Sequence, residues 1–137
     1  MINNKLIDPK SIVVVGGSND TSKPGGMVLK NILDFGYKGD LYVVNPKLSE
    51  VQGIKSYSTV EELPNCDCAI IAIAAKYCHH AIEVLTKEKE TRGFIILSAG
   101  FSEESEEGKK METEIVNTIN EVGGSLIGPN CVGFMNV

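Results

Sequence analysis

Short apolar runs alternate with helical patterns along the whole chain, and this alternation restricts the fold more than any other feature of the sequence. The runs are rich in Val and Ile and are apolar at consecutive positions: residues 12–15, 41–44, 69–73, 94–97 and, more weakly, 126–127. A strand with two apolar faces has to be covered on both of them, which is typical of parallel sheets. The runs therefore predict a parallel sheet between two layers of helices.

Three stretches between these runs place apolar side chains at the spacing of a helix. They are Val28, Leu29, Ile32 and Leu33 in the first, Cys78, Ala81, Ile82 and Leu85 in the second, and Met111, Ile115, Ile119 and Val122 in the third. The first helix is expected to end near Gly36 and the third at Gly123 and Gly124, while the longer connection after Asn45 is expected to hold one short helix within residues 60–63. The predicted fold is α/β: a Rossmann-like, doubly wound parallel sheet of about five strands with helices on both faces.

Length, charge and the N-terminus narrow the class of protein. A chain of 137 residues, 42% of them hydrophobic, suits one compact domain, which we expect to span residues 1–137. The net charge of −5 argues against nucleic acid as a partner, because nucleic-acid surfaces gather Lys and Arg. The N-terminus resembles neither a signal peptide nor a transit peptide, and no apolar run reaches membrane-spanning length. We therefore expect a cytoplasmic protein with no membrane partner.

The cysteines bear on disulfides and metals. A domain of this size with its own core needs no disulfide, so a reduced chain is the simpler interpretation. Cys66 and Cys68 form the one close pair, but no second pair follows at the spacing of a zinc finger. We interpret both as small buried residues at a strand edge and predict no metal site.

The loop after the first predicted strand, GGSNDTSKPGG at residues 16–26, leads directly into a predicted helix. Helix N-termini offer unpaired backbone N–H groups, and glycines let a phosphate approach the backbone without meeting a Cβ. Ser18 and Ser22 add hydroxyl donors, and Lys23 adds a charge. The loop predicts a cradle for a phosphorylated ligand, with the alternative that its glycines only form a tight turn.

The residues after the second predicted strand bear on the identity of that ligand. In the dinucleotide fingerprint GxGxxG, a following Asp or Glu binds the adenosine ribose, but here the loop has another spacing and the strand ends in Asn45, Pro46 and Lys47. A lysine suits a ribose that carries a phosphate, and such a contact is worth roughly 1.5–3 kcal/mol. NADP and coenzyme A both carry this phosphate; a solvated surface lysine is the alternative.

These segments together resemble a known family. VVVGGSNDTSKPGG, VVNPK, SAGFSEES and above all GPNCVGFMN are similar to motifs of the N-terminal CoA-binding domain of NDP-forming acyl-CoA synthetases. That family includes ADP-forming acetate–CoA ligases and, more distantly, the succinyl-CoA synthetase alpha subunit. The same module opens some bacterial protein lysine acetyltransferases. The resemblance covers nearly the whole chain, and its motifs follow the predicted strands in the expected order.

The resemblance implies which residues bind coenzyme A. They are Gly16, Gly17, Ser18, Lys23, Gly25 and Gly26 around the nucleotide and its phosphates, Asn45, Pro46 and Lys47 beside the adenosine 3′-phosphate, Ile73, Ala74 and Ala75 after the third strand, Ser98, Ala99, Gly100 and Phe101 along the pantetheine arm, and Asn130 near the thiol end. The family usually has a proline where the third strand ends, so the backbone at Ile73–Ala75 is expected to depart from the family's.

Other residues invite a catalytic interpretation that the sequence does not support. Cys131 has no histidine fixed beside it, so we favour packing over a nucleophile. Ligases of this family work through a phosphohistidine, but that residue belongs to a following domain, and His79 and His80 lie off the apolar stripe of a helix, where at least one is expected to face solvent. The acidic residues 103–107 are expected to begin a helix. We predict no catalytic residue.

The resemblance also implies partners. Full ligases of this kind continue into a phosphohistidine domain and an ATP-grasp unit, so we expect this chain to be the N-terminal part of a longer enzyme and not to turn over by itself. Its role there would be to position CoA for attack by the thiol on an acyl phosphate. The alternatives are the same module in a protein lysine acetyltransferase or a standalone CoA-binding protein, and an NAD(P)-binding domain.

Overall fold

A single sheet organises the molecule. The computed structural model describes residues 9–97 and 106–127, and within them seven strands have the order β3-β4-β2-β1-β5-β6-β7. The strands are β1 (Ser11–Val15), β2 (Asp40–Val44), β3 (Glu50–Val51), β4 (Ile54–Tyr57), β5 (Cys68–Ile71), β6 (Gly93–Ile96) and β7 (Ser125–Ile127). Every pairing is parallel except that of β3 with β4. The predicted parallel sheet is confirmed, and the expected count of about five strands is too low.

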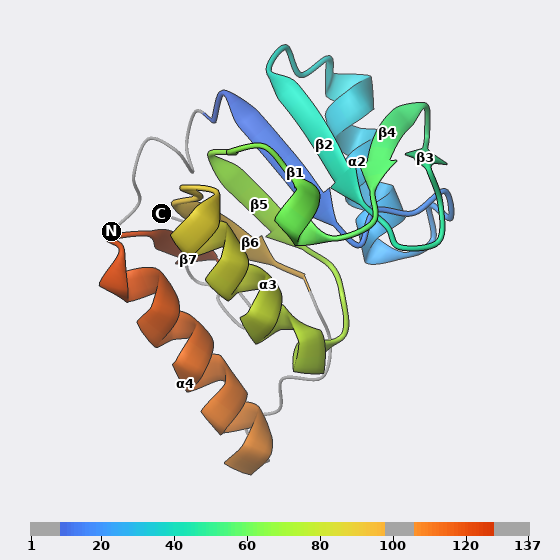
Figure 1. Cartoon of the computed structure of the whole chain (residues 1–137). Helices are drawn as coiled ribbons and strands as arrows, with labels where there is room; N and C mark the ends of the chain where they lie inside the picture. The colour runs from blue at the N-terminus through green and yellow to red at the C-terminus, as the bar shows by residue number, and fades with distance from the viewer. Residues whose placement is uncertain (1–8, 98–105, 128–137) are drawn as a thin grey trace.

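Helices cover both faces of this sheet, as predicted. Helix α2 (Pro24–Phe35) lies on one face, whereas α3 (Ala75–Glu88) and α4 (Glu106–Glu121) lie together on the other (Figure 1). A short 3-10 helix, η1 (Val60–Glu62), precedes β5 and confirms the short helix expected at residues 60–63. The helix that connects β1 to β2 therefore lies on one face, and the helices that connect β5, β6 and β7 lie on the other, which defines the doubly wound topology.

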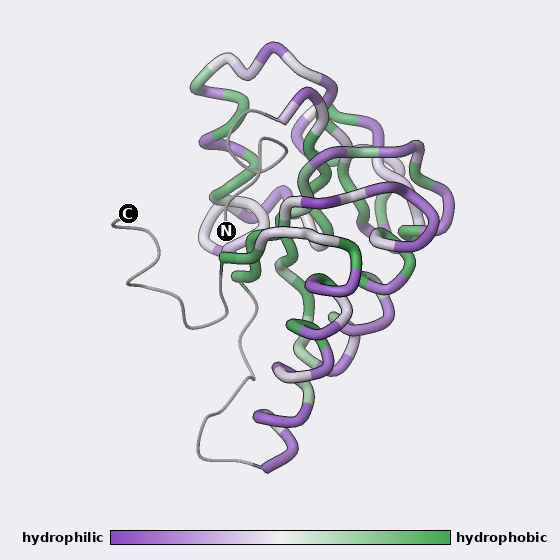
Figure 2. Tube along the Cα trace, turned by 90° about the vertical axis from the view of Figure 1, so that its left-hand side faces the viewer, coloured by the Kyte–Doolittle hydropathy of each residue, from purple (hydrophilic) through white to green (hydrophobic). Residues whose placement is uncertain are grey.

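The two faces of the sheet pack into separate parts of the core. Val13 and Val15 point into the cluster beneath α3 and α4, while Val14 between them packs with Leu29 of α2. All five residues of β1 are buried, so the strand is covered on both sides. Each fully buried side chain of this kind contributes about 1.5–3 kcal/mol to folding. Figure 2 shows the hydrophobic residues along the strands and the hydrophilic first turn of α4.

The ends of the helices follow from local sequence. Pro24 occupies the first turn of α2, where its missing N–H costs no hydrogen bond. Gly36 ends the helix in the left-handed region, with φ +79°, and its N–H bonds to the carbonyls of the last turn. Gly123 has φ +71° after α4. Both predicted helix ends are confirmed.

The β3–β4 hairpin is the element that the sequence prediction missed. For the longer connection after Asn45 the sequence predicted one short helix, but Glu50–Val51 and Ile54–Tyr57 also form an antiparallel pair closed by Gln52 and Gly53, with φ +49° and +84°. β4 then pairs in parallel with β2 and extends the sheet beyond it. A strand of two residues is too short to show a periodic pattern, which is why only the turn residues could have revealed it.

The cysteines confirm the interpretation as small core residues. Cys66, Cys68 and Cys78 are buried thiols, and burial raises the pKa of Cys68 to about 12. Within residues 9–97 and 106–127, no group of three His, Cys, Asp or Glu side chains is arranged to hold a metal ion. None of the helices in this part of the chain is long and apolar enough to cross a membrane.

Candidate functional site

The candidate site begins where the carboxyl ends of β1 and β5 meet. The N–H of Gly16 donates to the Val44 carbonyl at 2.9 Å, and the N–H of Ala72 donates to the Val15 carbonyl at 2.8 Å. Gly16 has φ +94°, and a Cβ added to it would lie 2.5 Å from the Ala72 carbonyl oxygen. Glycine is therefore required here for both conformation and space. In a doubly wound sheet this crevice, where the strand order reverses, is the usual ligand site.

The loop at residues 16–26 packs its own backbone against the first turn of α2. A Cβ on Gly25 would lie 2.1 Å from the Gly16 carbonyl oxygen, and one on Gly26 would lie 2.0 Å from the Asp20 carbonyl oxygen. These glycines thus serve a tight turn, which was the alternative to a phosphate cradle. The two roles are compatible, because the packing brings the loop and the start of the helix together.

The N-terminus of α2 has the properties of an anion site. Lys23, at the N-cap position, has an extended backbone and makes no side-chain capping bond, and the first turn contains no acidic residue among the described side chains. No side-chain cap therefore occupies its backbone N–H groups, and these groups together with the positive end of the helix dipole favour a negatively charged ligand. Pro24 and Lys23 are exposed beside it.

Asp20 shapes the middle of the loop. Its Oδ1 accepts the Ser22 hydroxyl at 2.6 Å and the Ser22 N–H at 3.0 Å, and its own N–H donates to Ser18 Oγ at 2.9 Å. The two bonds from Ser22, the hydroxyl first, lower the pKa of the Asp20 carboxyl. The Ser22 hydroxyl, expected as a donor to the ligand, thus gives its hydrogen to Asp20 instead.

Asn45 joins this loop to the end of β2. Its Nδ2 donates to the Gly17 carbonyl at 3.0 Å, and its Oδ1 accepts the Lys47 N–H at 2.8 Å. The side chain is therefore oriented at both ends by the protein backbone. Pro46 and Lys47 follow as exposed residues, so the Lys47 ammonium lies at the surface next to the loop.

An open hollow of about 730 Å³ adjoins Lys47 at the carboxyl ends of β1, β2 and β4. It is lined by Val15, Val44, Pro46, Lys47, Ser58, Thr59, Val60, Glu61, Ile73, Tyr77, His80 and Ala81. The strand and helix side chains give it an apolar base, while the hydroxyl, carboxylate, imidazole and ammonium groups lie around its rim. This combination suits a flat apolar group that carries polar substituents.

Most of the lining residues were not predicted from the sequence, and Glu61, Tyr77 and His80 are the polar ones among them that come from helices. Tyr77 is 57% exposed, and His80 Nε2 lies 3.0 Å from Glu61 Oε2. The hydrogen bond with His80 lowers the pKa of the Glu61 carboxyl. These residues come from α3 and η1, and only the packing of the two helices brings them to the hollow. A sequence pattern would not have found them.

The remaining predicted residues divide into three groups. Ile73 lines the hollow, Ala74 is the N-cap of α3 and Ala75 is its buried first residue. His80 is largely exposed, as expected for one of the histidine pair, whereas His79 lies between α3 and α4, with Nε2 3.2 Å from Thr118 Oγ1. A third group lies outside the described residues: Ser98, Ala99, Gly100, Phe101, Asn130 and Cys131.

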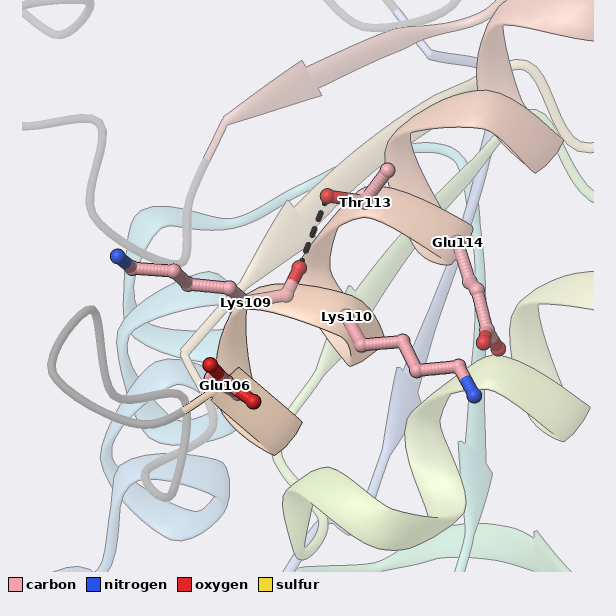
Figure 3. A pocket seen from close by; sticks show the side chains of 5 residues that line it. All are labelled: Glu106, Lys109, Lys110, Thr113 and Glu114. Carbon is pink, nitrogen blue, oxygen red and sulfur yellow. Dashed lines mark hydrogen bonds between the residues drawn. The ribbon is translucent and has the colours of Figure 1, made fainter.

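A second hollow, of about 450 Å³, lies along the first turns of α4 and is a weaker candidate. Figure 3 shows its side chains: those of Lys109 and Lys110 point in opposite directions, and the Thr113 hydroxyl donates to the Lys109 carbonyl of the same helix at 2.9 Å. Glu106 and Glu114 place carboxylates among the lysines. The described lining comes from one exposed helix and mixes both signs of charge, so it lacks the convergent donors of the first site.

Comparison with known proteins bears on this site. The family model described as "CoA binding domain" matches residues 10–137. The acetate–CoA ligase [ADP-forming] II subunit alpha of Pyrococcus furiosus is 42% identical over 96% of this chain and 28% of its own length, and the acetate–CoA ligase [ADP-forming] I of Archaeoglobus fulgidus is 39% identical over 96% of this chain and 19% of its own. The chain thus spans less than a third of either relative.

A solved structure agrees with the sequence comparison. The apo form of the dinucleotide forming acetyl-coenzyme A synthetase 1 of Ca. Korarchaeum cryptofilum superposes with a TM-score of 0.82 at 32% identity, covering 93% of this chain and 27% of that one. The resemblance predicted from the motifs is confirmed.

Proposed function

The chain belongs to the CoA binding domain family and is homologous to the N-terminal part of ADP-forming acyl-CoA synthetases, and from this premise we propose that its first loop and the adjoining hollow bind coenzyme A. One observation supports this site above others: the Asn45 side chain joins the glycine loop to the strand end that presents Lys47. Two features that favour phosphate, an uncapped helix N-terminus and a lysine, are thereby held on neighbouring segments.

The proposal gives each segment a part in binding. The N–H groups at the start of α2, beside Gly17, Ser18 and Lys23, receive the diphosphate, because backbone donors and the helix dipole favour that charge. The Lys47 ammonium pairs with the 3′-phosphate of the ribose. The hollow beside Pro46 and Ile73 takes the adenine, whose flat apolar faces suit its aliphatic lining. Asn45 acts by holding the two segments together.

We further propose that the chain serves as the CoA-positioning part of an ADP-forming acyl-CoA ligase. The relatives that it matches are about three to five times as long, which supports additional domains or subunits as partners, and the family resemblance points to a phosphohistidine domain and an ATP-grasp unit. The chain contributes no acid or base of its own in this scheme. It lowers the barrier by holding the CoA thiol where it attacks the carbonyl carbon of an acyl phosphate, so that the thioester forms as the bond to phosphate breaks and phosphate leaves.

Calorimetric titration of the 137-residue chain tests the proposed ligand. CoA should bind, and 3′-dephospho-CoA should bind about tenfold or more weakly, because it lacks the group that pairs with Lys47. NADH and NADPH serve as controls for a dinucleotide site. Tight binding of either nicotinamide dinucleotide, with no heat from CoA, would overturn the proposal.

A further inference from the structure

Gln52 contacts the glycine loop from a distant part of the chain. It lies in the turn of the β3–β4 hairpin, yet its side-chain Nε2 donates to the carbonyl of Ser18 at 2.8 Å and to the carbonyl of Gly26 at 3.0 Å. Its backbone N–H also donates to Asn19 Oδ1 at 2.7 Å. Ser18 lies near the start of the loop and Gly26 in the first turn of α2, so one amide group holds both ends of the loop.

The backbone conformation of Gln52 is unfavourable for a residue of its type, which indicates that its side chain has a role at this position. A two-residue hairpin turn with positive φ at both positions favours Asn or Gly, and Gln52 has φ +49° before Gly53 at +84°. Among the described non-glycine residues, only Gln52 and Glu90 adopt positive φ. A shorter residue would suit the turn better but would not span the distance to both carbonyls. Strain of this kind is retained where the surrounding contacts depend on it.

The contact is made at the most crowded part of the loop. A Cβ on Gly26 would lie 2.0 Å from the Asp20 carbonyl oxygen and 3.0 Å from that of Ser18, the same carbonyl that accepts from Gln52. The amide therefore reinforces a backbone contact that already fixes where the loop meets the helix. Half-burial of Gln52 limits competition from water for these bonds.

We propose that Gln52 is a positioning residue for anion binding: by holding Ser18 and Gly26 together, it keeps the first-turn N–H groups of α2 in the orientation that receives the phosphates of the ligand. For the identity of that ligand, the inference rests on the proposed function. Gln52 acts through the loop and does not itself touch the ligand. Preorganised donors bind more tightly because no ordering free energy is lost on binding.

Two variants and one control separate positioning from simple stability. Gln52→Gly removes both side-chain bonds, keeps the backbone bond to Asn19 and relieves the positive φ, so the fold should be retained. Gln52→Asn keeps an amide and tolerates positive φ, but its side chain is one methylene too short to reach both carbonyls. Glu90→Gly is the matched control, because it relieves the same backbone conformation and removes a hydrogen bond from Asn65, at a position between α3 and β6.

Three quantities are measured on each 137-residue chain: the dissociation constant for CoA, amide hydrogen exchange in residues 16–26 without ligand, and the melting temperature. Gln52→Gly should lower the affinity for CoA about tenfold, and Gln52→Asn should lower it by a similar or smaller factor. Amide exchange in the loop should accelerate, while the melting temperature stays within a few degrees of that of the wild type. Glu90→Gly should leave both the CoA affinity and the exchange of the loop unchanged.

The outcomes are distinguishable. If the wild-type chain binds CoA and Gln52→Gly binds it with the same affinity, the inference is overturned and the proposed function still stands. Equal losses of affinity in Gln52→Gly and Glu90→Gly would also overturn it. If the wild-type chain does not bind CoA, the proposed function fails, and the exchange data alone decide whether Gln52 holds the loop: acceleration confined to residues 16–26 supports the inference, and unchanged exchange overturns it.

Discussion

The glycine loop and the rim of the hollow are neighbours, but they are built in opposite ways. In the loop, backbone packs on backbone so closely that a Cβ on Gly25 or Gly26 would lie 2.1 or 2.0 Å from a carbonyl oxygen. Around the rim, Lys47, Tyr77 and His80 are exposed side chains. The loop therefore has a fixed shape without a ligand, whereas the rim supplies chemical groups that can be exchanged at little cost to the fold.

This contrast separates two contributions to binding. A preformed loop determines where a phosphate can lie, since its donors belong to the backbone and do not depend on side-chain identity. The rim determines which adenine nucleotide is accepted, because its charges recognise substituents on the ribose. Substitutions in the loop should therefore affect stability first, and substitutions in the rim should affect binding with little change in stability.

Gly26→Ala should have the largest effect. The added methyl meets the backbone carbonyl of Asp20, which cannot move without moving the loop, so we expect the free energy of unfolding to fall by about 3 kcal/mol or more. Urea denaturation measures the change.

Gly36→Ala, at the other end of the same helix, is the control. No described heavy atom lies within 4 Å of its added Cβ, and only the left-handed conformation at φ +79° is penalised, by about 1–2 kcal/mol. Equal losses at Gly26 and Gly36 would mean that the loop is not more tightly packed than an ordinary helix end.

Lys47→Glu should change binding without changing stability. Reversal of the charge beside the proposed 3′-phosphate should raise the dissociation constant for CoA by about tenfold to a hundredfold, because a charge-assisted bond is worth about 1.5–3 kcal/mol. Affinity for 3′-dephospho-CoA and the melting temperature should change little.

Lys109→Glu makes the same change of charge on α4, which lies beside α3 (Figure 1) and contributes none of the described residues that line the hollow, and should bind CoA like the wild type. An equal loss of affinity for CoA and dephospho-CoA in Lys47→Glu would show that Lys47 does not bind the 3′-phosphate.

The smallest expected effect concerns the Glu61–His80 pair at the rim. The hydrogen bond from His80 holds the pKa of the Glu61 carboxyl below its ordinary value of 4.5. The ionised carboxylate therefore stabilises the folded chain at any pH above 4.5, and this contribution is lost as the pH falls through the lowered pKa. Because both side chains are largely exposed, Glu61→Gln should reduce this pH dependence by only about 0.2–1 kcal/mol. Urea midpoints from neutral pH down to about pH 3.5 for both chains measure it; identical profiles would contradict the assignment.

The sequence predicted the elements whose signals are local. Consecutive apolar residues such as those of β1 indicate a strand covered on both faces, and Gly36 ends α2 through its own backbone conformation. Lys47 was predicted as a site residue because the carboxyl end of a parallel strand is where ligands bind. These inferences require no knowledge of which segments pack together.

The features that were missed depend on contacts distant in the sequence. β3 is too short for a pattern, and Gln52 reaches Gly26 across 26 positions of the chain. Tyr77 and His80 lie on the outward side of α3, and they line a hollow only because η1 packs beside that helix. Side chains on an exposed helical face give no periodic signal, so tertiary packing alone assigns them to the site.

Chemical-shift mapping on the isotopically labelled 137-residue chain tests the central claim most directly. On titration with CoA, the largest changes in the backbone amides should occur at Gly17, Gly25, Gly26 and Lys47, where the loop and the rim meet. Changes concentrated on α4 around Lys109 and Thr113, or no changes at saturating CoA, would contradict a CoA site at the carboxyl ends of the strands.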